Sequence, residues 1–382
     1  MTSFLVFTVL VLIGIAVWQL TKIFDLTQIG STSADSEIAN DKDNSVNGYL
    51  MFAFVGFIYV FTIYSLYAWS DLVLGTPASE HGKDVDSLMA ISMTLIFFVQ
   101  TFTQFLLHYF AFKYRGKEGQ KALYFADNNK LEAIWTIIPV IVLAGLIMYG
   151  LYTWNNIMFV DEEDKQDAIV IELYAKQFGW EARYAGDDKT LGKANVRLIE
   201  GINTLGVDLA DPAAQDDKVV TELHLPVGKK VIFKMRSQDV LHSAYMPHFR
   251  AQMNCVPGMI TQFSFTPTVT TADMRTDAAI VAKVDKINKI RTKNSAKIVA
   301  EGGAALDPYT FDYLLLCNKI CGSSHYNMQM KIVVDTPEEF KTWLSDKPTL
   351  AQQWKEANAP KPVETAVAPA VDSTKVVAQV IK

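Results

Sequence analysis

The stretch Cys317-Asn-Lys-Ile-Cys321-Gly-Ser-Ser-His325-Tyr-Asn-Met328 places two thiols, an imidazole and a thioether in one short loop. Two of the chain's three cysteines lie in this loop. Soft sulfur ligands together with imidazole nitrogen favour copper over hard cations, and the methionine favours copper over zinc. A second imidazole, His242, follows a strand-like run upstream. This set of ligands predicts two coppers bridged by both cysteine sulfurs.

A disulfide between Cys317 and Cys321 is the alternative explanation of the pair, because disulfides persist in oxidising compartments. It would leave His325 and Met328 unexplained, so the sequence favours a metal site. A membrane-tethered copper chaperone would also use a Cys-x-x-x-Cys and a distant histidine. Such a protein would show a thioredoxin-like βαβ pattern, and the predicted strands of this chain have no helices between them.

Short runs of alternating apolar and polar residues predict half-buried strands around the loop, separated by Gly, Pro and Asp turns. The clearest are Ile169–Ala175, Val219–Leu225, Lys230–Met235 and Ile260–Phe265. Several strands at this spacing predict a sandwich or small barrel. Two stretches look inserted between the strands, at about 186–218 and 271–308. The second is rich in Lys and Arg, which is typical of a solvated face and also fits a docking element for a neighbouring subunit or an electron donor.

Apolar residues make up 50% of the 382-residue chain and concentrate in its N-terminal half. A bilayer is spanned by about 20 mostly apolar residues. Four segments meet or approach this length: Phe4–Phe24, Tyr49–Trp69, Leu88–Phe112 and Ala133–Trp154. The first has no positive n-region and no clear cleavage motif, so we expect a retained helix and not a signal peptide. The sequence therefore predicts a multi-pass membrane anchor.

The connection 113–130 carries Lys113, Arg115, Lys117, Lys121 and Lys130, which places it in the cytoplasm by the positive-inside rule. Everything after Asn155 is then expected in the periplasm, outside a bacterial inner membrane. Four spans put the N-terminus outside as well. The net charge of −6, without a basic domain, argues against nucleic acid as a partner.

The chain resembles subunit II of the haem–copper cytochrome c oxidases from about Leu88 to Thr336. The blocks that carry the resemblance are Leu131-Glu132-Ala-Ile-Trp135-Thr-Ile-Ile-Pro139, Gln177-Phe-Gly-Trp180, Leu225-Pro-Val-Gly228, Asp239-Val-Leu-His242-Ser, Pro257-Gly258 and the loop 317–328, called the copper loop below. The resemblance implies a transmembrane hairpin followed by an all-β cupredoxin-like Greek-key barrel. The apolar segments predict about four transmembrane α-helices, so the first two are a departure from the family. The resemblance implies single-electron transfer from a c-type cytochrome to a dinuclear copper centre, CuA, and then to haem in subunit I, where dioxygen is reduced and protons are pumped.

The resemblance also implies a role for each ligand. Cys317 and Cys321 correspond to the bridging thiolates, and His242 and His325 to the terminal imidazoles. Met328 and the backbone carbonyl of Lys319 correspond to the two weak ligands.

Two departures from the family concern a magnesium site. Lys319 stands where the family has glutamate, and Asn254 where aspartate is expected. Mg²⁺ prefers hard, anionic oxygen ligands, which an ammonium does not supply. We therefore expect the usual Mg²⁺ to be absent or its site rebuilt, with the Lys319 ammonium supplying positive charge near the haem propionates.

Two further predictions concern the entry of electrons and protons. Phe178 stands where the family has a tryptophan, so electron entry is expected at Phe178 or at Trp180; alternatively, Trp180 only packs the barrel. Glu132 resembles the glutamate that opens a proton-uptake path into subunit I. A carboxylate that complements the dipole at a helix N-terminus is the alternative for Glu132.

The sequence divides into extra helices at 1–75, a hairpin at 76–156, the copper domain at 157–336, and a C-terminal helix with a flexible tail at 337–382. No Cys-x-x-Cys-His occurs in it, so haem is expected only in partner proteins. The expected partners are subunit I, other oxidase subunits and a separate c-type cytochrome, and the extra helices would suit a larger respiratory assembly. A quinol-oxidase subunit would lack the copper ligands, and a soluble CuA reductase would lack the hairpin. A purely structural subunit would not require the copper ligands.

Overall fold

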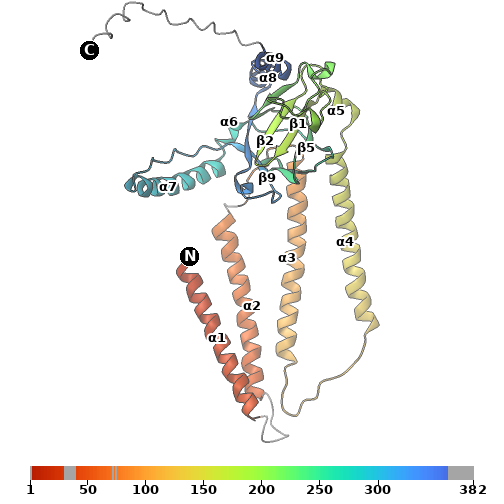
Figure 1. Cartoon of the computed structure of the whole chain (residues 1–382). Helices are drawn as coiled ribbons and strands as arrows, with labels where there is room; N and C mark the ends of the chain where they lie inside the picture. Colours follow the sequence, from red (N-terminus) through yellow and green to blue (C-terminus); the bar gives the residue numbers. More distant parts are fainter. Residues whose placement is uncertain (1, 30–39, 71–72, 74, 360–382) are drawn as a thin grey trace, which may run out of the picture. The chain divides into compact units, whose positions relative to one another are not determined.

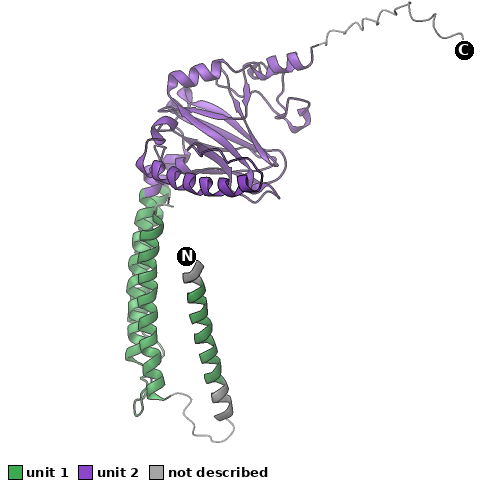
Figure 2. Ribbon diagram, turned by 90° about the vertical axis from the view of Figure 1, so that its left-hand side faces the viewer, with its two compact units in different colours: residues 1–73, 87–151 green, residues 74–86, 152–382 purple. Residues whose placement is uncertain are grey.

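The computed structural model describes residues 2–29, 40–70, 73 and 75–359 (Figure 1). Contacts divide the chain into two units, one of residues 1–73 with 87–151 and the other of residues 74–86 with 152–382 (Figure 2). Residues 76–86, which the sequence grouped with the hairpin, thus belong with the extramembrane unit. The predicted tail lies mostly in 360–382, outside the described residues.

The first unit consists mainly of four apolar helices: α1 (Thr2–Ile29), α2 (Asp41–Trp69), α3 (Gly82–Lys113) and α4 (Asn129–Met158). The start of α3, up to residue 86, and the end of α4, from residue 152, belong to the second unit. Each of the four helices is long and apolar enough to cross a membrane, and their mean hydropathies lie between 1.6 and 2.3. Their side chains are largely exposed in the isolated chain, as expected for helices whose surroundings are lipid or other subunits. The four predicted spans are confirmed.

The extra helix α2 packs on α3 near the connection that follows α3. Gly48 allows this approach, because a Cβ there would lie 2.6 Å from the Phe112 ring. The Phe112 ring contacts Tyr49 and Phe52 at centroid distances of 5.0 and 5.2 Å. Asn44 donates a hydrogen bond to the Gly116 carbonyl over 3.2 Å. Helix α2 is therefore attached to α3 by specific contacts.

The second unit is built around two five-stranded sheets, in the orders β3-β2-β1-β5-β8 and β4-β10-β9-β6-β7. The strands are β1 (Ile169–Lys176), β2 (Gly179–Tyr184), β3 (Lys218–Val220), β4 (Leu223–Pro226), β5 (Val231–Ser237), β6 (His242–Met246), β7 (Ala251–Cys255), β8 (Thr261–Phe265), β9 (Tyr313–Cys317) and β10 (Gln329–Asp335). Their inward side chains, such as Leu173, Phe233 and Leu315, form one buried core. This is the cupredoxin-like barrel that the resemblance predicts.

One predicted strand is wrong in its bounds. Val219–Leu225 forms two strands, since β3 pairs with β2 in one sheet and β4 pairs with β10 in the other. The chain changes sheets at Thr221-Glu222, and each half takes the partner that buries its own apolar side chains. Alternation of apolar residues alone cannot reveal such a change of partner.

The first insertion, between β2 and β3, is a loop with two short 3₁₀ turns, η2 (Val196–Leu198) and η3 (Pro212–Ala214). Arg183 of β2 fixes it, because its buried guanidinium bonds Asp217 over 2.6 Å, Glu172 over 2.7 Å and the Gly192 carbonyl over 2.9 Å. Removing one partner of such a buried ionic network typically costs about 3–5 kcal/mol. The insertion is therefore a fixed part of the domain.

The second insertion is helical. It contains α6 (Thr271–Met274) and the long α7 (Ala278–Ala300), which Asp277 caps by accepting from the amides of Ala279 and Ile280. Outside this insertion, the unit has further short helices: α5 (Glu162–Asp167) before β1, η4 (Pro247–Phe249) between β6 and β7, and η5 (His325–Asn327) between β9 and β10. Ile280 inserts into the core of the barrel and so anchors α7 to it.

The C-terminal segment forms two helices, α8 (Pro337–Ser345) and α9 (Leu350–Ala357), where a single helix was predicted. Thr336 with Glu339, and Thr349 with Gln352, form a capping box at the start of each helix. Pro348 lies between them and lacks the amide hydrogen that a continuous helix would use. Trp343 of α8 stacks on His224 of β4 with a ring-centroid distance of 3.9 Å, which attaches this segment to the barrel.

His248 of η4 lies between the barrel and α7, with its ring against Phe311 and Tyr313. Its Nδ1 is buried and has no hydrogen-bond partner among the described residues. Burial is the main cause that lowers its pKa, to about 4, and the positive charges of Lys283 and Arg250 add to the effect. The neutral ring is therefore the form that fits this position.

We predict that protonation of His248 destabilises the extramembrane unit in acid. In the unfolded chain the histidine pKa is near its ordinary value of 6.5, so this contribution is complete above pH 6.5 and is lost as pH falls toward 4. A His248→Phe variant should lose less thermal stability than the wild type between about pH 7 and pH 5, in unfolding curves of the purified chain. Equal losses in the two proteins would contradict the prediction.

Candidate metal centre

The site forms where β9 and β10 are joined by the copper loop, residues 317–328. Strand β9 ends at Cys317 and β10 begins just after Met328, and the amide of Cys317 donates to the Met328 carbonyl over 3.1 Å. Strand β6 begins at His242 and pairs with β9, with Ala244 opposite Cys317. The strand pairing thus brings a histidine from a distant segment to the loop.

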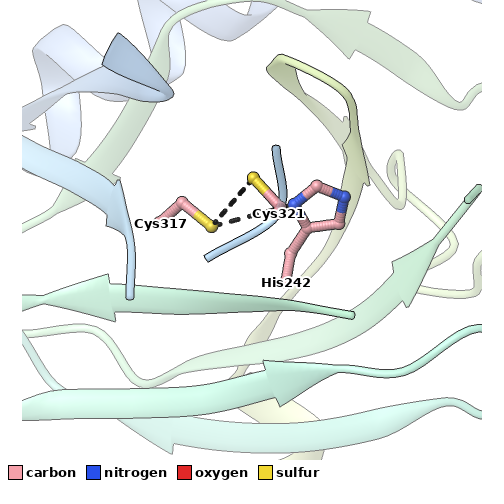
Figure 3. Close-up of side chains that lie close together, drawn as sticks. All are labelled: His242, Cys317 and Cys321. Carbon is pink, nitrogen blue, oxygen red and sulfur yellow. Dashed lines mark hydrogen bonds between the residues drawn. The ribbon is translucent and has the colours of Figure 1, made fainter. Parts of the chain in front are cut away.

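The side chains of His242, Cys317 and Cys321 converge in this place (Figure 3). The two sulfurs are 3.8 Å apart, and Nδ1 of His242 lies 3.7 Å from the Cys317 sulfur. This separation is far beyond the ~2.05 Å of a disulfide bond, and both cysteines are free. The predicted pair is therefore present as two adjacent thiols.

The other two predicted side chains contact the second sulfur. Nδ1 of His325 and Sδ of Met328 each lie 3.7 Å from the Cys321 sulfur. The backbone carbonyl of Lys319 lies 3.2 Å from the Cys317 sulfur. Each cysteine therefore has one imidazole beside it, which is the arrangement that two metals bridged by two sulfurs require.

This set of donors fits a pair of copper ions. It combines two thiols, two imidazoles and a thioether, all of them soft or borderline ligands. His242 is fully buried, while Cys321 and Met328 are 6% and 2% exposed. Burial, reinforced by the neighbouring Cys317 thiol, raises the pKa of the Cys321 thiol to about 11. Metal binding would therefore have to displace protons from the thiols.

Asp239 and Gln177 hold the site from outside, and sequence reasoning gave neither a role of its own. Nε2 of His242 and an Asp239 carboxylate oxygen are 2.8 Å apart, and the other oxygen accepts from the Gln177 amide over 2.7 Å. The Gln177 side chain donates to the Cys321 carbonyl. Both residues lie in sequence blocks that carry the resemblance. Their arrangement orients Nδ1 of His242 toward the sulfurs and connects the copper loop to the turn between β1 and β2 by a hydrogen bond.

The two aromatic candidates differ in exposure. Trp180 is 5% exposed and meets the His242 ring edge to face at a centroid distance of 6.3 Å. Phe178 is 38% exposed, and its ring lies against Gly322 of the copper loop. A Cβ at Gly322 would come within 2.7 Å of this ring. Of the two, Phe178 keeps part of its ring exposed, and Trp180 is buried against His242.

Other predicted residues lie away from the cluster. Glu132 is exposed in the first turn of α4, where it also complements the helix dipole. The Lys319 side chain is exposed, whereas Oδ1 of Asn254 is buried without a hydrogen-bond partner among the described residues. Cys255 is fully buried, which raises its thiol pKa to about 12 and keeps it protonated. His108 is buried in α3, and its Nδ1 lies 2.8 Å from the Gln104 carbonyl oxygen, to which it can donate a hydrogen bond.

Comparison with known proteins connects both units to one family. Residues 67–153 match the cytochrome C oxidase subunit II transmembrane domain, and residues 169–273 match the periplasmic domain of that subunit. The chain is 31% identical to the alternative cytochrome c oxidase subunit 2 of Bradyrhizobium diazoefficiens, over 76% of this chain and 88% of the relative. It is 25% identical to cytochrome c oxidase subunit 2 of Thermostichus vulcanus, over 73% and 80% of the two chains.

Among solved structures, the periplasmic domain of cytochrome oxidase subunit II from Bradyrhizobium japonicum matches with 19% identity and a TM-score of 0.27, covering 46% of this chain and 91% of that one. The match to the periplasmic domain ends at residue 273, just before α7, and the transmembrane match begins near the end of α2. Helices α1 and α7 lie outside both matches.

Proposed function

The chain belongs to the cytochrome c oxidase subunit II family, and from this premise we propose that it is the electron-entry subunit of a terminal respiratory oxidase. It would accept single electrons from a c-type cytochrome and pass them to haem in subunit I, where dioxygen is reduced and protons are pumped. The observation that carries the proposal is the meeting of His242, Cys317, Cys321, His325 and Met328 within contact distance.

We assign the ligands from this geometry. Cys317 and Cys321 would supply the bridging thiolates of a copper pair. His242 and His325 would each be the terminal imidazole ligand of one copper. Met328 and the Lys319 carbonyl would be weak ligands. A copper pair bridged in this way shares one electron between two metals and so acts as a one-electron carrier. The barrel holds the donors in place through β6, β9 and β10, and ligands that do not move lower the cost of changing oxidation state.

We propose that the copper domain lies on the periplasmic side of a bacterial inner membrane. The basic connection between α3 and α4 supports this orientation by the positive-inside rule. Around the site, Ile320 and Tyr326 are 89% and 88% exposed. Apolar side chains this exposed beside a metal centre are suited to contact with partner proteins.

Copper binding tests the central proposal. Residues 161–382, produced as a separate protein and loaded with copper, should bind two coppers per chain and give the electron paramagnetic resonance spectrum of one electron shared by both. Cys321→Ala should abolish this spectrum, because it removes a bridging sulfur. Cys255→Ala is the matched control and should retain it. One copper per chain, or a mononuclear spectrum, would contradict the proposal.

Electron entry through Phe178 is the second test. In the intact oxidase, Phe178→Ala should lower the rate of donor oxidation several-fold at unchanged copper content, because it removes the exposed ring on the copper loop. Trp180→Phe should instead change the copper spectrum, since Trp180 packs against His242. A donor rate that falls in Trp180→Phe but not in Phe178→Ala would reverse these assignments.

We propose that the magnesium site of the family is missing or rebuilt. Lys319 would repel the cation, and Asn254 offers a neutral amide oxygen in place of a carboxylate. The purified oxidase should therefore hold much less than one Mn²⁺ after growth in manganese, as measured by metal analysis. The double change Lys319→Glu with Asn254→Asp should increase the content. Stoichiometric Mg²⁺ or Mn²⁺ in the wild type would contradict this.

Proton entry at Glu132 remains a prediction that rests on the sequence block around it. The exposed carboxylate at the start of α4 is compatible with uptake and with a purely capping role. Unchanged turnover and proton pumping in a Glu132→Gln oxidase would leave only the capping role.

A further inference from the structure

Helix α7 is the long helix of the second insertion (Figure 1). The chain that follows it returns along its side and is hydrogen-bonded at three levels. Asn288 bonds both the amide and the carbonyl of Tyr309, over 2.7 and 3.0 Å. Arg291 donates to the Asp307 carbonyl over 2.9 Å, and Ser295 accepts from the Leu306 amide over 2.8 Å. These bonds hold the helix and the return segment together as one body.

The two faces of α7 differ in character. The face toward the barrel and the return segment contains buried or half-buried residues at helical spacing, namely Ile280, Val284, Ile287, Asn288, Arg291, Ser295 and Ile298. The opposite face contains exposed lysines at intervals of three or four residues, namely Lys283, Lys286, Lys289, Lys293 and Lys297. Lys283 lies at the edge of this face and also borders the barrel. At 1.5 Å per residue this lysine stripe is about 21 Å long.

The stripe has a strong positive charge in an acidic chain. Helix α7 carries five lysines and Arg291 against one acid, Asp285, while the whole chain has a net charge of −6. Asp285 pairs with Lys289 over 2.7 Å. A row of like charges on one face creates a field that attracts an acidic surface over a Debye length of about 8 Å.

A protein is a better partner for this face than a lipid surface. A helix that lies in a membrane interface needs a free apolar face opposite its basic residues. The apolar face of α7 is covered by the barrel and the return segment. The exposed apolar residues do not replace it, because Val281 and Val299 lie on one side of the helix and Ile290 on the other.

A transient protein partner is a better fit than a permanent subunit. Permanent interfaces are apolar at their centre and depleted in lysine. Lysine is a strongly hydrated point charge, which favours fast encounter and release over tight binding. An electron donor must arrive, transfer one electron and leave, so the stripe has the chemistry that such a partner requires.

The position of α7 connects it to the copper loop. Lys283 and Val284 line a cavity of about 190 Å³ with Leu314 and Leu316 of β9. Strand β9 then ends at Cys317, the first predicted ligand. Ahead of α7, Arg275 donates to the Phe311 carbonyl over 2.8 Å and pairs with Asp312 over 2.7 Å. A partner bound to the stripe would therefore be held at a fixed position relative to the copper loop.

We propose that the lysine stripe of α7 is an electrostatic docking surface for an acidic face of the donor c-type cytochrome. The inference rests on the proposed function and adds to it the charge of the partner and the element that attracts it. The stripe determines the rate at which the donor associates, and the copper ligands determine the electron transfer that follows.

The test uses the intact oxidase and two purified donors, an acidic and a basic c-type cytochrome. Lys293→Glu with Lys297→Glu should lower the second-order rate constant for the acidic donor about tenfold at low ionic strength and flatten its salt dependence. The rate with the basic donor should not fall. Lys341→Glu with Lys355→Glu is the matched control, since it reverses two exposed lysines on α8 and α9, and it should behave as the wild type.

Each other outcome has a defined meaning. Equal effects of the two lysine pairs, or no effect of the α7 pair, would overturn the inference. Loss of another subunit from the purified α7 variant would also overturn it, because the stripe would then be a subunit interface. If the copper spectrum is intact but the rate with the acidic donor does not change in the α7 variant, only the docking inference is wrong and the proposed function is retained. A wild-type oxidase without the shared-electron copper spectrum would refute the proposed function itself.

Discussion

The candidate metal centre depends on the pairing of β6 with β9. Ala244 lies opposite Cys317, and the Asn318 amide donates to the Ser243 carbonyl over 3.0 Å. This register puts the first residue of one strand, His242, beside the last residue of the other. A shift by one residue would turn His242 away from the sulfurs, because neighbouring side chains in a strand point to opposite faces. The copper loop can then be short, since it has to supply only the remaining proposed ligands.

Two long insertions interrupt the strands of the barrel, the first between β2 and β3 and the second between β8 and β9, and β6 still pairs directly with β9. The first is fixed by the buried guanidinium of Arg183, which takes Asp217 and Glu172 as counter-ions. The second is fixed by Ile280 in the core and by the hydrogen bonds of the segment that returns along α7. Each insertion has its own anchor, so the strands that carry the ligands keep their places.

Much of this arrangement follows from local sequence. The four spans have apolar runs long enough to be recognised, and the copper loop carries its ligands within twelve residues. One error has a local cause, because the C-terminal helix is interrupted at Pro348. The others concern interactions between distant segments. Val219–Leu225 alternates like one strand but divides between two sheets. The burial of Trp180 and the role of Gln177 also depend on segments far away in the chain.

By itself, the sequence determined the membrane anchor and predicted the type of metal and most of the proposed ligands, because these depend on composition and on close spacing. Only the tertiary structure decided which aromatic ring is exposed, how Asp239 and Gln177 hold His242 and the copper loop, and which face of α7 remains open. Those features arise where strands and helices distant in sequence pack together. Burial and hydrogen-bond geometry exist only after that packing, and local patterns do not encode them.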